Sequence, residues 1–232
     1  MTYGTVRERF LDERRAAAHL TCDATLIPAP GRYLLAHDPA SDAPLPVPVF
    51  SAGTSPEGFL AASPLPRDWL PGQTLALRGP LGRGFLLPAN ARRVALAAWD
   101  VSPAYLLGLL DLAHRQDAAL SLVCADPPDD LPADVEIRPL AALAEVAQWA
   151  DYLALAITRA SLPGWRERAG LGNPLQAWSE RSRGLPREAQ ALILAPMPCG
   201  GLAKCGVCSV PVKRGNVLLC EDGPVIDLSE IL

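Results

Sequence analysis

The chain has 232 residues, of which 50% are apolar and 20% are charged, and its net charge is −4. This length is enough for two small domains with buried cores and an extension. The acidic balance argues against nucleic acid as the main partner, and no apolar run approaches the length of a membrane span. The opening residues, MTYGTVRERF, contain no apolar signal-peptide core, so the cytoplasm is the expected compartment.

Residues 1–88 are expected to form a small antiparallel barrel with a helix at its N-terminal end. Residues 1–20 are rich in charge and contain the stretch RERFLDERRAAAHL, which favours an exposed helix. Further along, short apolar runs alternate with proline and glycine. The runs 32–36, 47–51 and 74–77 are typical of short barrel strands. The 24 prolines of the chain indicate many loops and edge strands.

Residues 89–189 have a different pattern, in which apolar strands alternate with helices. Ser102 is a suitable N-cap with Pro103 at the first helical position. Such an alternation predicts a mostly parallel sheet. The predicted strands are 93–99, 119–125, 134–139, 152–157 and 190–196, and the predicted helices are 103–115 and 140–150, with 160–184 helical or loop-like.

Residues 190–232 hold four of the six cysteines, in the spacing C-x5-C-x2-C-x11-C. Plant-type ferredoxins bind a [2Fe–2S] cluster through a similar C-x4-C-x2-C loop and a fourth, distant cysteine. Glycines between the cysteines would let such a loop wrap closely around a cluster. Zinc, disulfides and chance clustering stay as alternatives, although zinc sites usually pair two short knuckles and this segment has one. The predicted metal ligands are Cys199, Cys205, Cys208 and Cys220.

The cysteine segment resembles the end of the electron-transfer subunit of class 1B dihydroorotate dehydrogenases, within the ferredoxin–NADP reductase superfamily. That family ends in M-x-C-G-x-G-x-C-x-x-C and then C-x-D-G-P-V. Here the first part begins at Met197 and has one extra residue in its first gap, and the second part reads CEDGPV from Cys220. The resemblance implies a [2Fe–2S] cluster and a hetero-oligomer with a catalytic oxidoreductase subunit. This partner would be a dihydroorotate dehydrogenase of pyrimidine biosynthesis or another oxidoreductase.

Other segments resemble the flavin-binding barrel of the same superfamily: PGRY from Pro30, LPGQTL from Leu70 and GPLGRGF from Gly79. The R-x-[YF]-[ST] strand that holds FAD in the superfamily matches Pro48-Val49-Phe50-Ser51. Phe50 and Ser51 are therefore the candidate FAD contacts. However, Pro48 replaces the arginine, which removes a bidentate charge-assisted contact, and the later glycine–threonine turn for the phosphates is missing. A flavin-binding barrel and a barrel kept for packing and partner docking both stay open.

The nicotinamide-nucleotide loop of the superfamily, G-G-x-G-x-x-P, has lost its glycines here. The matching segment reads AAWDVSP and keeps only Pro103, and AITR from Ala156 replaces a C-G-P loop. Dinucleotide binding depends on close approach of the backbone, and Asp100 would set a negative charge against phosphate. We therefore expect no binding or turnover of NAD(P).

The sequence thus predicts a β plus α/β protein: a reductase-like barrel over 1–88, an α/β layer over 89–189 and a cluster-binding segment over 190–232. Its predicted function is electron transfer through a [2Fe–2S] cluster to or from a partner oxidoreductase, with no catalytic residue of its own. One alternative is a non-catalytic reductase-fold scaffold with a structural metal site made of the four cysteines. Another is a complete reductase that binds FAD and NADH through unrecognised residues.

Overall fold

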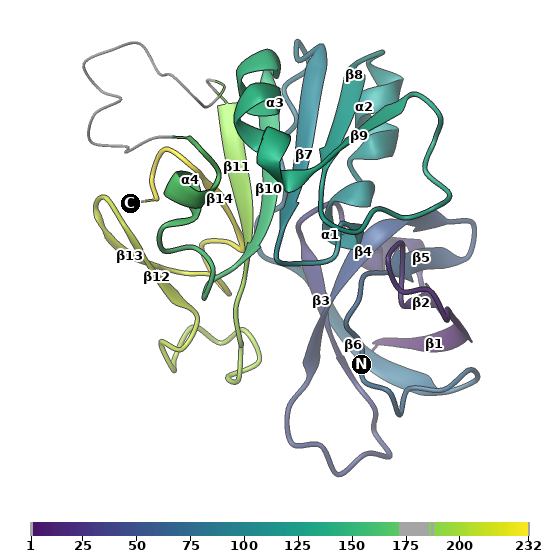
Figure 1. Cartoon of the computed structure of the whole chain (residues 1–232). Coiled ribbons are helices and arrows are strands. Elements are labelled where there is room, and N and C mark those ends of the chain that lie inside the picture. The colour runs from purple at the N-terminus through teal and green to yellow at the C-terminus, as the bar shows by residue number, and fades with distance from the viewer. Residues whose placement is uncertain (1, 172–185, 187, 232) are drawn as a thin grey trace.

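The computed structural model describes residues 2–171, 186 and 188–231. Its first part is a closed antiparallel barrel in the strand order β1-β2-β5-β4-β3-β6, which surrounds a small apolar core (Figure 1). Short apolar runs between turns form this barrel because each strand turns one face inward. The strands are β1 (Thr2–Arg9), β2 (Ala18–Thr21), β3 (Tyr33–His37), β4 (Val47–Ser55), β5 (Gly58–Ala61) and β6 (Thr74–Leu81), with a short 3-10 helix at Ala24–Leu26.

The prediction of an N-terminal helix over residues 1–20 was wrong. Residues Thr2–Arg9 are strand β1, which pairs with β2 on one side and with β6 on the other. Val6 is fully buried, whereas Arg7 and Glu8 are exposed. The charged residues that suggested a helix therefore lie on the solvent side of a barrel strand, where pairing with both neighbours outweighs local preference.

The second part is a six-stranded sheet in the order β14-β11-β10-β7-β8-β9. Neighbouring strands are parallel except β14, which runs antiparallel to β11. Together with the barrel, this sheet confirms the predicted β plus α/β class. The strands are β7 (Arg93–Trp99), β8 (Ala119–Val123), β9 (Val135–Arg138), β10 (Tyr152–Thr158), β11 (Glu188–Leu194) and β14 (Val225–Asp227), and the helices are α1 (Ala104–Leu107), α2 (Leu110–Arg115), α3 (Leu143–Trp149) and α4 (Trp165–Arg168), with a 3-10 turn at Leu140–Ala142.

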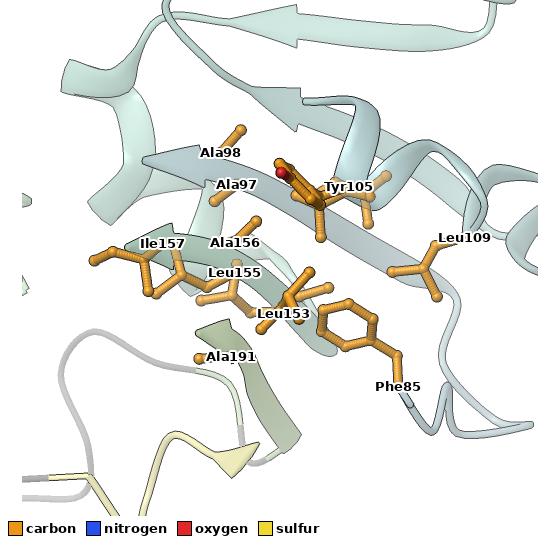
Figure 2. Close-up of a cluster of buried hydrophobic side chains, with 14 of the residues drawn as sticks. Phe85, Ala97, Ala98, Tyr105, Leu109, Leu153, Leu155, Ala156, Ile157 and Ala191 are labelled. Atoms are coloured by element: carbon orange, nitrogen blue, oxygen red, sulfur yellow. The ribbon is translucent and has the colours of Figure 1, made fainter. Parts of the chain in front are cut away.

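Strands β7 and β10 are nearly continuous apolar runs because the sheet is covered on both faces. Figure 2 shows part of this core, with Phe85, Tyr105 and Leu109 near the two strands. Small residues such as Ala97 and Ala156 leave room on β7 and β10 for these larger side chains. All five residues belong to one core cluster, so the barrel exit and the helical layer are packed onto the same sheet.

The predicted helix 103–115 is interrupted. It consists of the short helices α1 and α2, with Gly108 as the residue that ends α1. A Cβ atom at Gly108 would lie 3.3 Å from Pro30 and 3.6 Å from the carbonyl oxygen of Ser51. The chain is therefore close to the barrel at the break, where a larger residue would crowd two barrel segments.

Three motifs that are far apart in the sequence meet at the centre of the molecule. The backbone N–H of Arg83 donates to the carbonyl oxygen of Gly223 at 2.5 Å, and Arg83 also forms a β-bridge with Pro224. Gly31, from the PGRY turn, lies so close to Val225 that a Cβ atom would stand 2.5 Å from its side chain. The PGRY turn, the barrel-exit segment GPLGRGF and the segment after Cys220 thus form one packed junction.

The cysteine segment contributes β11 and β14 to the six-stranded sheet, whereas the residues between them form a separate two-stranded sheet. After β11 the chain forms the cysteine loop, which we define as residues 199–208, and then a hairpin of β12 (Ser209–Val212) and β13 (Gly215–Leu218) (Figure 1). The range 160–184 contains α4, and residues 172–184 of that prediction lie outside the described residues. No helix in the described ranges is long and apolar enough to cross a membrane.

Candidate metal centre and interdomain cavity

The hairpin β12–β13 brings the third and fourth cysteines together. Cys208 directly precedes β12 and Cys220 follows shortly after β13, and Ser209 pairs with Leu218 in the hairpin. The backbone N–H of Leu219 donates to the carbonyl oxygen of Cys208 at 3.3 Å. The two cysteine side chains are within hydrogen-bond contact, and both residues are buried. Burial is the main cause that raises the pKa of Cys220, to about 12, and the hydrogen bond to the Cys208 thiol adds to this effect.

The first and second cysteines form another pair. Cys199 is half-buried, Cys205 is exposed, and their side chains hydrogen-bond to each other. The backbone N–H groups of Lys204 and Leu202 also donate to the Cys199 sulfur, and these bonds lower the pKa of Cys199 to about 6. Backbone amides aimed at a sulfur stabilise its thiolate form, which is the form that binds a metal.

The loop between these cysteines is tightly curled. Gly200, Gly201, Ala203 and Gly206 all adopt left-handed backbone angles, with φ between 56° and 72°. Glycine adopts such angles at no steric cost, and three glycines among these four positions keep the strain small. The curl turns the amides of residues 202, 204 and 205 toward the Cys199 sulfur.

The barrel wall holds the cysteine loop through two side chains. The Arg78 guanidinium on β6 donates to the carbonyl oxygen of Gly200, and the Tyr33 hydroxyl on β3 donates to that of Cys220 at 3.3 Å. A Cβ atom at Gly201 would lie 3.1 Å from the Tyr33 hydroxyl. Burial is the main cause that raises the pKa of Tyr33, to about 12, and the nearby sulfur atoms of Cys220 and Cys208 add to this effect. No sequence pattern pointed to Arg78, since an arginine on a barrel strand is usually only a solvated residue.

The fit of a metal to this site depends on its donor chemistry. Across residues 2–171, 186 and 188–231, no group of three or more Cys, His, Asp or Glu side chains is arranged to hold a metal ion as it stands. The four thiols instead form two contacting pairs, and Cys199 of one pair acts electrostatically on Cys220 of the other. All four are free of disulfides. Four soft thiol donors suit a [2Fe–2S] cluster or zinc.

The two candidate FAD contacts have structural roles in the barrel. The Phe50 ring packs between Tyr33, at a centroid distance of 5.7 Å, and Tyr105, at 5.4 Å in an edge-to-face arrangement. The buried Ser51 hydroxyl donates to the carbonyl oxygen of Gly53 and accepts from its N–H. Phe50 still borders the cavity described next, whereas the hydrogen bonds of the Ser51 side chain stay within its own strand.

An open cavity of about 870 Å³, which we call the interdomain cavity, lies between the barrel and the α/β layer. It is bounded by β4, by the start of α1 and by the ends of β7, β10 and β11. Ligands of open α/β sheets bind at such carboxyl ends of parallel strands. Met197, two residues before the first cysteine, also lines the cavity. The cavity therefore extends to the beginning of the cysteine loop.

The end of β7 has no open phosphate loop. Trp99 is buried, with 8% of its surface exposed, and its indole nitrogen has no hydrogen-bond partner in the described part of the chain. Asp100 follows with a φ of 55° and accepts a hydrogen bond from the Ser161 hydroxyl at 3.0 Å. An aromatic side chain and a carboxylate thus occupy the end of β7, and the absence of a dinucleotide site here stays a prediction.

Comparison with known proteins gives the fold. No protein-family model and no curated protein matches the sequence. Among solved structures, the NADH-dependent reduced ferredoxin–NADP oxidoreductase described for flavin-based electron bifurcation matches with a TM-score of 0.71 at 15% identity, over 99% of this chain and 89% of that chain. The chain has the ferredoxin-reductase fold.

Two other solved reductases agree with this result. The ferredoxin reductase in carbazole 1,9a-dioxygenase has a TM-score of 0.59 at 17% identity, over 80% of this chain and 66% of that chain. Phthalate dioxygenase reductase, described as a modular structure for electron transfer from pyridine nucleotides to [2Fe–2S], has a TM-score of 0.51 at 14% identity, over 99% of this chain and 96% of that chain. Identities this low establish the shared fold alone.

Proposed function

We propose that this protein is an electron-transfer subunit that carries a [2Fe–2S] cluster on Cys199, Cys205, Cys208 and Cys220. The observation that carries the proposal is the gathering of these cysteines into two contacting thiol pairs, with backbone N–H groups donating to the Cys199 sulfur. A bound cluster of this type accepts and releases one electron at a time. The chain itself holds the thiolates, curls the loop around them and fixes the loop to the barrel.

The proposed partner is a catalytic oxidoreductase subunit in a hetero-oligomer. The motif CEDGPV and the cysteine spacing resemble the electron-transfer subunit of dihydroorotate dehydrogenase, and this enzyme or another oxidoreductase is the partner we propose. The exposed tip of the cysteine loop supports such docking, because Cys205 is exposed there beside Leu202 and Val207, whose exposed fractions are 55% and 40%. Exposed apolar residues beside a redox site are suited to a protein contact.

A spectroscopic experiment on the protein purified without oxygen tests the cluster. We expect a brown preparation with iron and acid-labile sulfide in equal amounts, about two of each per chain. After dithionite reduction, the cluster should give an electron paramagnetic resonance signal. Cys205→Ser should abolish this signal, whereas Cys22→Ser, which changes a half-buried cysteine of the barrel, should retain it.

The second candidate function is a binding module in which a zinc ion on the same four cysteines fixes the tail to a reductase-shaped scaffold. The four thiol donors also suit this candidate, since structural zinc sites can take four cysteines. A colourless preparation with one equivalent of zinc would support it and would exclude the electron-transfer proposal. Acid extraction of the same sample reports whether FAD is bound, and FAD together with NADH oxidation would instead indicate a complete reductase.

A further inference from the structure

Arg159 connects the α/β layer to the cysteine loop. It directly follows β10, and its backbone N–H donates to the carbonyl oxygen of Leu194, the last residue of β11, at 2.9 Å. Its guanidinium donates to the carbonyl oxygens of Val207 and Ser209, the second at 3.4 Å. These two residues are the neighbours of Cys208 in the chain. Arg159 therefore holds the backbone around one predicted metal ligand from the edge of the sheet.

The backbone at Cys208 is fixed at three consecutive carbonyl oxygens. The carbonyl oxygen of Cys208 accepts from the backbone N–H of Leu219 at 3.3 Å, and those on either side of it accept from Arg159. Cys208 is also buried. Because the backbone of Arg159 is itself bonded to β11, the positive charge of its guanidinium has a defined place beside this cysteine.

The charge of the Arg159 guanidinium is not neutralised by a carboxylate. Among the described residues it forms no ion pair, and the acceptors of its hydrogen bonds are carbonyl oxygens. Arg159 is half-buried, so salt and water screen its charge less than that of an exposed residue. Other charges of the cysteine segment lie on the exposed Lys204 and Glu221 and on Asp222, whose carboxylate accepts from the N–H of Leu218 at 3.0 Å. Arg159 is thus a fixed cation next to the site.

A fixed cation next to a [2Fe–2S] cluster changes its redox equilibrium. Reduction of a bound cluster adds one electron and breaks no bond, so the site becomes more negative by one charge. The electron comes from dithionite in a titration and from the partner oxidoreductase in the proposed function. Coulomb attraction stabilises the more negative form, and the potentials of such clusters depend on the net charge around them.

We propose that Arg159 is a positioning residue that raises the reduction potential of the metal centre, because it fixes the backbone around Cys208 and places a positive charge beside it. This inference rests on the proposed [2Fe–2S] cluster. It assigns to the end of β10 a role in setting the potential, although β10 holds none of the four cysteines.

A redox titration of the whole chain, purified without oxygen and followed by electron paramagnetic resonance, tests this role. Arg159→Gln keeps a hydrogen-bond donor and removes the charge. At a fixed potential, the ratio of reduced to oxidised cluster should be about tenfold lower than in the unmodified protein, which is a midpoint potential about 59 mV lower for one electron. Arg159→Lys keeps the charge and should retain most of the original potential.

Arg92→Gln is the matched control. The Arg92 guanidinium also donates to a backbone carbonyl oxygen, that of Gln116, but Arg92 precedes β7. Because β7 and β10 are parallel, Arg92 lies at the opposite end of the sheet from Arg159, and its loss should leave the potential unchanged. An unchanged potential in Arg159→Gln would overturn the inference, as would an equal fall in Arg159→Gln and Arg159→Lys.

Iron, acid-labile sulfide and zinc are measured on the same samples. Unmodified protein that contains zinc and no iron refutes the proposed cluster, and the role of Arg159 with it. Protein that contains the cluster, but whose potential does not respond to Arg159→Gln, refutes the role of Arg159 alone. Low iron in Arg159→Gln together with normal iron in Arg159→Lys would also support the need for a cation at this position, and low iron in both variants would contradict it.

Discussion

Tyr33 and Arg78 act on the cysteine loop through its backbone and leave the thiols free. Each donates to one carbonyl oxygen, Tyr33 to Cys220 and Arg78 to Gly200. Hydrogen bonds to the backbone fix the path of a loop without occupying the donor atoms that a metal needs. The two side chains therefore position the cysteine loop, although they lie on barrel strands that hold none of the four cysteines.

Replacing Arg78 with leucine should loosen the cysteine loop. The variant keeps an apolar stem but loses the hydrogen bond to Gly200, at a cost of about 1 kcal/mol in the free energy of unfolding. In metal-free protein, thiol labelling of Cys199 should become faster, and after reconstitution less iron should be retained. Arg67→Leu, at an exposed position before β6, should change neither quantity. Equal labelling rates in the Arg78 variant and the unmodified protein would rule out the positioning role.

At the scale of single residues, the sequence predicted which cysteines come together, but not what holds them. The spacing predicted all four cysteines as one site, and the structure joins them as the pairs Cys199–Cys205 and Cys208–Cys220. By contrast, Tyr33 and Cys220 are separated by 187 positions. A contact over that distance depends on how the barrel sits on the sheet, and no local pattern encodes that arrangement.

The element that joins the two layers is the barrel-exit segment GPLGRGF. Gly82 has a φ of +72°, and a Cβ atom there would lie 2.5 Å from the carbonyl oxygen of Gly223 and 2.7 Å from Pro224. The neighbouring Arg83 bonds to the same carbonyl. Because the contact joins the barrel to the segment that follows Cys220, a change at Gly82 should affect the cysteine loop as well as overall stability.

Gly82→Ala should lower the free energy of unfolding by about 2–4 kcal/mol, since both backbone strain and a clash with backbone atoms oppose the methyl group. Gly72→Ala is a matched control, because Gly72 has a φ of +89° but no atom within 4 Å of the added carbon. Gly72→Ala should lower the free energy of unfolding by only about 1 kcal/mol, because backbone strain alone opposes the methyl group. Urea denaturation measures both variants, and equal losses would show that the junction is not tightly packed.

Asp151 ties the starts of β7 and β10 together and makes stability depend on pH. Its carboxylate accepts from the Arg93 guanidinium at 2.6 Å and from the backbone N–H groups of Arg92 and Arg93. The Arg93 guanidinium is the main cause that holds the pKa of Asp151 below its ordinary value of 3.8. A lowered pKa means that the contribution to stability is complete above the ordinary value and is lost as the pH falls through the lowered one.

Asp151→Asn should therefore be less stable than the unmodified protein at pH 7, by about 1 kcal/mol because the ion pair is partly exposed. The difference should shrink as the pH is lowered through the acidic range, since both proteins then lack the charge. Asp68→Asn serves as the exposed control and should show no such convergence. Chemical denaturation at a series of pH values gives the comparison, and a gap that stays constant into acid would contradict this interpretation of the carboxylate.

Element types were predictable where the apolar pattern was strong, and the errors lie where packing outweighs it. The strand 93–99 coincides with β7, whose every side chain but the first is buried. The N-terminal strand was mistaken for a helix because its charged residues face water. The helix 103–115 was predicted as continuous, whereas it breaks at Gly108, the position at which Pro30 lies close to the chain. The first error lies inside the barrel, where β1 pairs with β2 and β6, and the second lies where α1 meets the barrel.

At the scale of the whole molecule, the fold has an open cavity between its two layers, and side chains occupy the loop at the end of β7. Trp99 and Asp100 occupy the turn in which a dinucleotide would need open backbone. In the proposed electron-transfer role, the electrons would come from another source, such as a partner subunit. The barrel supplies a frame for the cysteine loop through Tyr33 and Arg78.

The last prediction follows from this arrangement. Under anaerobic conditions NADH and NADPH should not bleach the visible absorption of the protein, because the Trp99 ring and the Asp100 carboxylate oppose the approach of a pyrophosphate. Dithionite should bleach the same sample, which controls for an intact redox centre. Calorimetry with ADP-ribose should likewise detect no binding. Rapid bleaching by NADH would mean that a dinucleotide binds elsewhere on the chain, and the assignment of this protein as a subunit that receives its electrons from a partner would then fail.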